Sequence, residues 1–138
     1  MDFSAERNRG IKMATRPRPL SPHLQIYRPQ LTASLSIIHR ATGVALAGGS
    51  IGLIWGVVAV ALGADAYEYF SAFAASIFGR LLTAMFVFCL IYHWLNGLRH
   101  LAWDTGWGLQ IKQAYATGWL VVALAPTLTA VSLWCLWT

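Results

Sequence analysis

The sequence predicts an all-α membrane protein with three transmembrane helices. Of its 138 residues, 57% are hydrophobic and only 11% are charged, whereas soluble domains carry about 25% charged residues. So few polar side chains cannot cover a soluble fold, and the apolar residues gather in three runs long enough to cross a bilayer. We therefore expect a three-helix transmembrane domain over residues 31–138, with spans at about 34–62, 73–103 and 118–137.

The first 30 residues are expected to form a cytoplasmic arm. Seven of the ten Lys and Arg residues lie in the first 40 positions, and four of the five prolines lie before position 30. The segment after the first span has no Lys or Arg, so the positive-inside rule places the N-terminus in the cytoplasm and the C-terminus outside. The arm is too long and too rich in proline for the leader of a signal peptide, and Asp2 and Glu6 are unusual for a transit peptide.

The first span contains 22 consecutive uncharged residues, Ala41–Leu62. At 1.5 Å per residue this run crosses a hydrocarbon core of about 30 Å. The helix is expected to begin near Ser34, so that its first turns carry Ser36, His39 and Arg40. Glycines repeat at every fourth position further along, and small residues at this spacing favour close helix packing: Gly48, Gly52 and Gly56.

The segment Gly63–Ser71 is expected to be a short loop, because it contains two acidic residues between apolar runs. A second span follows, then a polar connection over 104–117 and a third span in which Pro126 is tolerated. Because the second span returns to the starting side, it carries Arg99 and His100 to the membrane face at which Arg40 lies.

His93 is the candidate ligand for a cofactor metal, because ionisable side chains within a membrane span are usually kept for a function. Asn96, Gly97 and His100 lie on the same helix face, and Gly97 leaves room for a flat macrocycle such as haem, whose iron takes axial imidazole ligands. His100 lies about 10 Å along the helix, too far to share one iron. His39 is expected two or three turns nearer the membrane surface. A neutral histidine bonded across a helix bundle is the alternative.

The polar residues at this membrane face are suited to bind two kinds of ligand, a quinone and the propionates of a haem. Ser36 and Arg40, one turn apart, are candidates for binding a quinone carbonyl, and Arg40 and Arg99 for pairing with haem propionates. Alternatively Arg40 extends to the lipid headgroups and Ser36 caps the helix. Asp104 is expected to pair with Arg99, with His100 or with an arginine of the arm, or else to be a solvated charge. The two cysteines lie in apolar runs without metal-site spacing, and little polar surface remains for nucleic acid.

Three segments, in this order and spacing, resemble the cytochrome b membrane-anchor subunits of succinate dehydrogenase (respiratory complex II). The likeness covers about Pro19 to the chain end, and the segments are Ser21-Pro22-His23-Leu24-Gln25-Ile26-Tyr27, Ser36-Ile37-Ile38-His39-Arg40-Ala41-Thr42-Gly43 and His93-x-x-x-Gly97-x-Arg99-His100-x-x-x-Asp104. The resemblance implies that the chain packs with a second anchor subunit into a larger helical bundle. One haem b would lie between the two subunits, each supplying one axial histidine.

Carried over by motif, His93 takes the position of the haem ligand. His39, Arg40 and His100 take positions beside the haem or its propionates, and Ser36 and Arg40 take those of the ubiquinone site. The resemblance also implies a flavoprotein subunit and an iron–sulfur subunit as partners, and a bacterial inner membrane as location. The chain has no flavin motif, so it would help pass electrons to ubiquinone without oxidising succinate itself. A haem-free structural anchor and the anchor of a fumarate reductase are the alternatives.

Overall fold

The computed structural model describes residues 29–138, and in this part of the chain it contains four helices and no strand. Three of them, α1, α3 and α4, are long and apolar enough to cross a membrane, as the sequence predicted. The arm up to residue 28, including the motif Ser21–Tyr27, lies outside the described residues. The four helices are α1 Leu31–Leu62, α2 Ala64–Ala75, α3 Ile77–Asp104 and α4 Ile111–Trp137.

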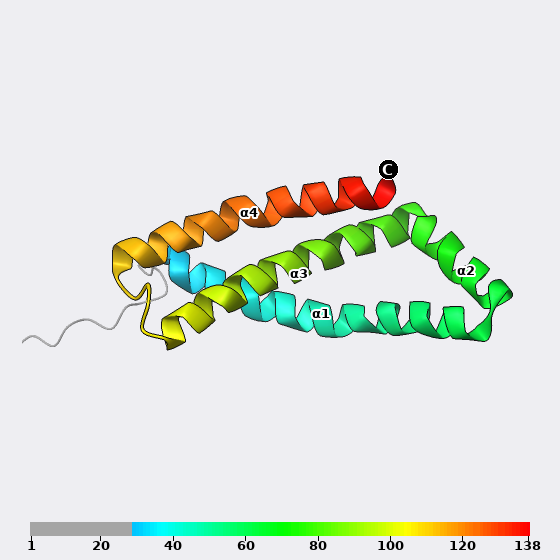
Figure 1. The fold of residues 1–138 in the computed structure, drawn as a ribbon, viewed down its shortest axis with the longest axis horizontal. Helices are drawn as coiled ribbons and strands as arrows, with labels where there is room; N and C mark the ends of the chain where they lie inside the picture. The colour runs from blue at the N-terminus through cyan, green and yellow to red at the C-terminus, as the bar shows by residue number, and fades with distance from the viewer. Residues whose placement is uncertain (1–28) are drawn as a thin grey trace, which may run out of the picture.

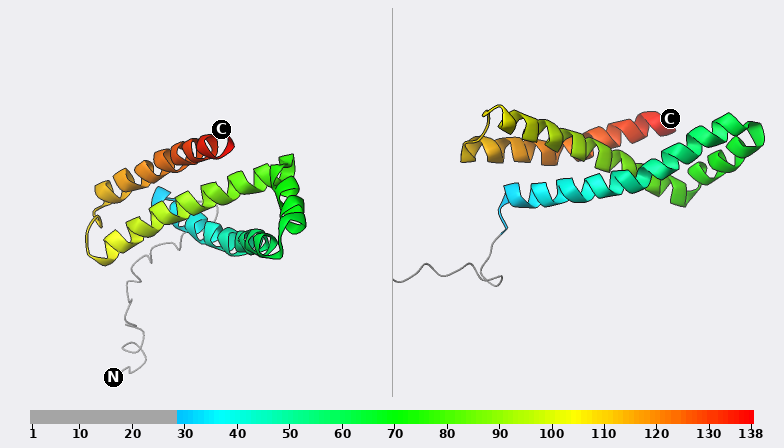
Figure 2. Two further views of the ribbon diagram at one scale, coloured as in Figure 1. Left: turned by 45° about the vertical axis from the view of Figure 1, so that its right-hand side comes forward. Right: turned by 90° about the horizontal axis from the view of Figure 1, so that it is seen from below.

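The long helices run alternately up and down, with α3 between α1 and α4 (Figure 1). The start of α1, the end of α3 and the start of α4 lie at one end of the molecule, and the other two views agree (Figure 2). The short helix α2 and the C-terminus lie at the opposite end. This topology confirms that two polar segments far apart in the sequence come together at one end of the bundle.

The prediction of a loop at Gly63–Ser71 is wrong, because every residue of this segment after Gly63 belongs to helix α2. Gly63 has a positive φ of 107°, which turns the chain out of α1. Asp65 then lies in the first turn of α2, where its carboxylate suits the helix dipole. Trp55 of α1 packs on Phe70 and Phe73 of α2, with ring centroids 5.1 Å apart in both pairs. These aromatic contacts hold α2 against α1. The loop was predicted from the acidic residues of the segment, which give no information about such contacts.

A sharp corner separates α2 from α3. The Ser76 hydroxyl caps α3 by accepting a hydrogen bond from the Gly79 backbone N–H at 3.1 Å. Gly79 is buried, and a Cβ at this position would collide with the backbone carbonyl of Phe73. The corner therefore needs glycine, and it decides where α3 starts and which residues α3 presents to α1.

Helix α4 begins at Ile111, well before the expected start of its span at 118. Gly106 and Gly108, both with positive φ, make the turn that precedes it. The helix continues through Pro126, as expected. The difference arises because hydropathy marks the apolar run, whereas the hydrogen-bonded helix also includes a polar first part.

The three long helices meet in a small core of Leu35, Tyr92, Val121 and Ala125. Glycines allow close packing along α1, as predicted, although Gly56 is the one member of the predicted repeat that makes a close approach within the described residues, and Gly49, outside the repeat, makes another. Gly49 and Gly56 face Phe86 and Phe70, and a Cβ at either would be too close to the ring. Gly48 and Gly52 have nothing within 4 Å and line an apolar cavity of about 590 Å³.

Replacing Gly79 by alanine is expected to destabilise the chain by roughly 1–3 kcal/mol, the usual cost of overpacking, because the added methyl group meets backbone that cannot rotate away. Thermal unfolding of the chain in detergent measures this change. Gly48→Ala is the matched control, since its methyl group would find open space within the chain and alanine favours a helix. Equal melting temperatures for the two variants would contradict the account of the corner.

Candidate functional site

Three histidines from two helices converge where α1 crosses α3. The rings of His39 and His93 are stacked, with centroids 3.9 Å apart and planes 14° from parallel. The ring of His100 lies 5.3 Å from that of His39, and it contacts Trp103 edge-on at 5.0 Å. The structure thus brings together the three histidines that the sequence singled out.

The stacking corrects one expectation. His39 was expected two or three turns nearer the membrane surface than His93, but the two rings lie at the same level along the bundle. The sequence does not show how far α1 and α3 are shifted along each other, and this shift sets the relative depth of the two rings. In this arrangement His39 is not suited to be a second ligand of the same iron, because two parallel stacked rings cannot bind opposite sides of one iron.

His93 is held through its Nδ1 atom. This atom lies 3.0 Å from the backbone carbonyl oxygen of His39 and 3.2 Å from the hydroxyl oxygen of Thr42. The same hydroxyl donates a hydrogen bond to the His39 carbonyl at 2.8 Å. A Cβ at Gly43 would lie 3.0 Å from His93 Cε1, so glycine allows the ring to lie against α1.

The donor set fits a haem better than a free metal ion. Within residues 29–138 no group of three or more His, Cys, Asp or Glu side chains is placed to hold a metal ion. A haem iron needs only one axial imidazole from this chain, and His93 Nε2 makes no hydrogen bond in that region. His39 Nδ1 is buried without a partner, and a Cβ at Gly97 would meet only His39 Cε1, at 4.0 Å. The histidine cluster thus contains ring nitrogens without hydrogen-bond partners in the described part of the chain, and the absence of a side chain at Gly97 leaves space beside them.

Arg99 does not join the histidines. Its side chain is buried and faces α4, where Nη2 donates to the Ala114 carbonyl at 2.9 Å and Nε donates to the Thr117 hydroxyl at 3.1 Å. The guanidinium also lies 4.1 Å from the centroid of the Trp103 ring. Only Nη1 is left without a partner. Asp104, expected to pair with Arg99 or to be solvated, is exposed.

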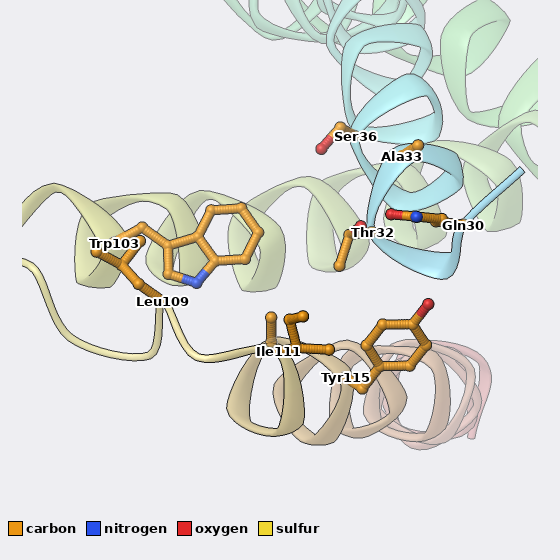
Figure 3. Close-up of a pocket in the computed structure, with 9 residues that line it drawn as sticks. Gln30, Thr32, Ala33, Ser36, Trp103, Leu109, Ile111 and Tyr115 are labelled. Atoms are coloured by element: carbon orange, nitrogen blue, oxygen red, sulfur yellow. The ribbon is translucent and has the colours of Figure 1, made fainter. Parts of the chain in front are cut away.

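Ser36 and Arg40 share one face of α1, as expected, and the Arg40 Nε–H donates to the Ser36 backbone carbonyl at 3.4 Å. Arg40 is exposed, whereas Ser36 is half-buried and lines a cavity of about 500 Å³. Figure 3 shows the Ser36 hydroxyl on the side of α1 that faces Trp103, with Tyr115 of α4 across the opening. This cavity opens at the end of the bundle that holds the histidines.

Two contributors to this end of the molecule escaped the sequence interpretation. Thr42 was named only as part of the Ser36–Gly43 segment and was given no role, yet it is buried and contacts His93. Tyr92 donates its hydroxyl hydrogen to the Leu35 carbonyl at 3.1 Å, which ties α3 to α1 beside His93. The available signals were the spacing of three residues between His39 and Thr42, which places them on one helix face, and the position of Tyr92 next to His93.

Fold and site together define an integral membrane protein that carries a histidine cluster between its helices. Comparison with known families narrows this further, since residues 14–132 match the family of succinate dehydrogenase/fumarate reductase transmembrane subunits. The match covers most of the chain, and the chain belongs to this family.

Individual relatives agree with this assignment. The succinate dehydrogenase cytochrome b556 subunit of Rickettsia prowazekii is 43% identical over 112 residues, covering 81% of this chain and 87% of the relative. The subunit of the same name from Paracoccus denitrificans is 39% identical over 116 residues, covering 84% and 89% of the two chains. The mitochondrial cytochrome b560 subunit of Mus musculus is 45% identical over 112 residues, covering 78% and 65%.

A double-mutant cycle tests the role of Arg99. If the guanidinium holds α3 to α4, Arg99→Ala and Thr117→Val should show a coupling energy of about 1.5–3 kcal/mol, as expected for a hydrogen bond to a charged group. Unfolding of the single and double variants in detergent gives this value. Thr127→Val is the control partner, since the Thr127 hydroxyl bonds only within α4. Additive effects of Arg99→Ala and Thr117→Val would contradict the assignment.

Proposed function

We propose that this chain is the haem b-binding membrane anchor of a succinate:ubiquinone oxidoreductase. The observation that carries the proposal is the setting of His93: its Nδ1 is engaged by α1, and its Nε2 makes no hydrogen bond within the described residues. An imidazole held in this way is suited to bind a metal. Membership of the succinate dehydrogenase/fumarate reductase family supports the same function.

In this proposal His93 would hold the haem iron through Nε2, and a second anchor subunit would supply the other ligand. Haem b, when bound, provides a site that accepts and returns one electron within the membrane. The His39 ring stacks on His93 and the His100 ring lies next to that of His39, and Arg40 offers a charge for the propionates. Arg99 could pair with a propionate only through Nη1, the one nitrogen of its guanidinium that has no partner within the described residues.

Ubiquinone is the proposed electron acceptor, and its headgroup would bind near the first turns of α1. The Ser36 hydroxyl can donate a hydrogen bond to a quinone carbonyl. Arg40 supplies positive charge where negative charge develops during reduction, and its exposure leaves the guanidinium free to reach a ligand. The cavity lined by Ser36 gives a headgroup access to this end of the bundle.

The remaining assignments follow from the same proposal. Electrons from succinate would pass through a flavoprotein subunit and an iron–sulfur subunit docked at this end of the bundle. The arm would contact those soluble subunits on the cytoplasmic side of a bacterial inner membrane. Bacterial relatives from Rickettsia and Paracoccus support the location, and the excess of basic residues before α1 supports the orientation.

His93→Ala is expected to abolish or strongly change the low-spin haem spectrum of the complex, because the iron loses an axial ligand. Reduced-minus-oxidised optical spectra of the purified complex measure this. His100→Ala is the control and should have a milder effect, because His100 does not contact the His93 ring. An unchanged spectrum in the His93 variant would overturn the ligand assignment. A wild-type complex with no haem signal would identify a haem-free structural anchor.

Ser36→Ala and Arg40→Ala are each expected to lower succinate–ubiquinone activity about 5- to 150-fold, because each removes one stabilising contact of about 1–3 kcal/mol. Succinate oxidation by an artificial acceptor should remain largely intact. Arg40→Lys should recover only part of the activity, since it keeps the charge but loses the planar fork. Unchanged quinone kinetics in both alanine variants, at normal assembly, would place the quinone site elsewhere.

A further inference from the structure

We propose that Thr42 is a positioning residue for His93: together with the His39 carbonyl, its hydroxyl selects the imidazole tautomer that presents Nε2 to a haem iron. This inference rests on the proposed function, in which His93 is the axial ligand. It assigns a role to a buried threonine that contacts no ligand itself.

The tautomer follows from the hydrogen-bonding capacity of each neighbour. The His39 carbonyl oxygen can only accept a hydrogen bond, and it lies 3.0 Å from His93 Nδ1. The hydrogen must therefore be on Nδ1, because the other tautomer would set a nitrogen lone pair against the oxygen. The Thr42 hydroxyl donates its own hydrogen to the same carbonyl at 2.8 Å, so towards Nδ1, at 3.2 Å, it acts as an acceptor.

With Nδ1 protonated and donating to two oxygens, Nε2 is left with its lone pair. A neutral imidazole binds a metal through such a lone pair, and the hydrogen bond on the opposite nitrogen fixes the ring and raises the basicity of the ligand. The arrangement therefore prepares His93 for an axial bond before any cofactor arrives.

The surroundings allow this arrangement little freedom. The Thr42 side chain is only 5% exposed, and its hydroxyl bonds to its own helix, so it cannot turn away to solvent. On one side Gly43 lets the ring approach, and on another the His39 ring stacks on it at 3.9 Å. The orientation of the imidazole is thus set by α1, although the ligand belongs to α3.

The test compares Thr42→Val, which keeps the shape but loses the hydroxyl, with Thr42→Ser, which keeps the hydroxyl. Each is introduced into the intact complex, and ferric haem retention is measured against excess apomyoglobin, with the haem midpoint potential as a second readout. Loss of an outer partner typically weakens metal binding 10- to 100-fold. Because the carbonyl contact remains, we expect retention to fall about tenfold in Thr42→Val.

We also expect the midpoint potential to rise in Thr42→Val, since a less basic imidazole stabilises ferric iron less. Thr42→Ser should restore both values. Thr129→Val is the matched control, because Thr129 is also buried and bonds a carbonyl of its own helix, far from the histidines. If Thr42→Val fails to assemble, Thr42→Ala serves in its place, as it adds no bulk.

Wild-type haem retention and potential in the variant without the hydroxyl would overturn the inference, and so would equal changes in Thr42→Ser and Thr42→Val. These results are distinguishable from a failure of the proposed function. A His93→Ala complex that loses its haem, beside an unaffected Thr42→Val complex, would refute only the role of Thr42. A His93→Ala complex that keeps its low-spin haem would refute both.

Discussion

The structure depends on the contact between the His93 imidazole and the backbone of α1. Within a membrane no water is available to a polar side chain, so a hydrogen bond to another part of the protein stabilises it. His93 finds two acceptors on α1, and Gly43 lets the ring come close enough to reach them. One contact thereby fixes how α1 crosses α3, stacks the rings of two histidines and leaves one ring nitrogen available.

Neighbouring contacts keep this crossing in register. One turn away the Tyr92 hydroxyl bonds the Leu35 carbonyl, and further along α1 Gly49 receives the Phe86 ring. At the far end the corner at Gly79 sets the starting point of α3, and α2 packs its aromatic rings against Trp55. The geometry of the histidine cluster is therefore controlled partly from the opposite end of the bundle.

The two arginines near the cluster have different environments despite similar positions in the sequence motifs. Arg99 is 5% exposed, donates hydrogen bonds to α4 and lies over the face of the Trp103 ring. Arg40 is exposed and makes one long bond to its own helix. The guanidinium of Arg99 holds α4 against α3, whereas the exposed guanidinium of Arg40 is available to bind a ligand. Burial, which the sequence does not show, separates the two roles.

The sequence by itself determined the three spans, their antiparallel order and the meeting of the two polar segments at one end, because hydropathy and helix length suffice for these. It also selected the three histidines, Ser36 and Arg40. It missed helix α2, the depth of His39 and the contact of Thr42, since all three depend on how helices pack rather than on periodicity within one helix. Only the tertiary structure decided which ring nitrogen of His93 is engaged and where Arg99 points, because both are set by atoms more than a dozen residues away in the chain.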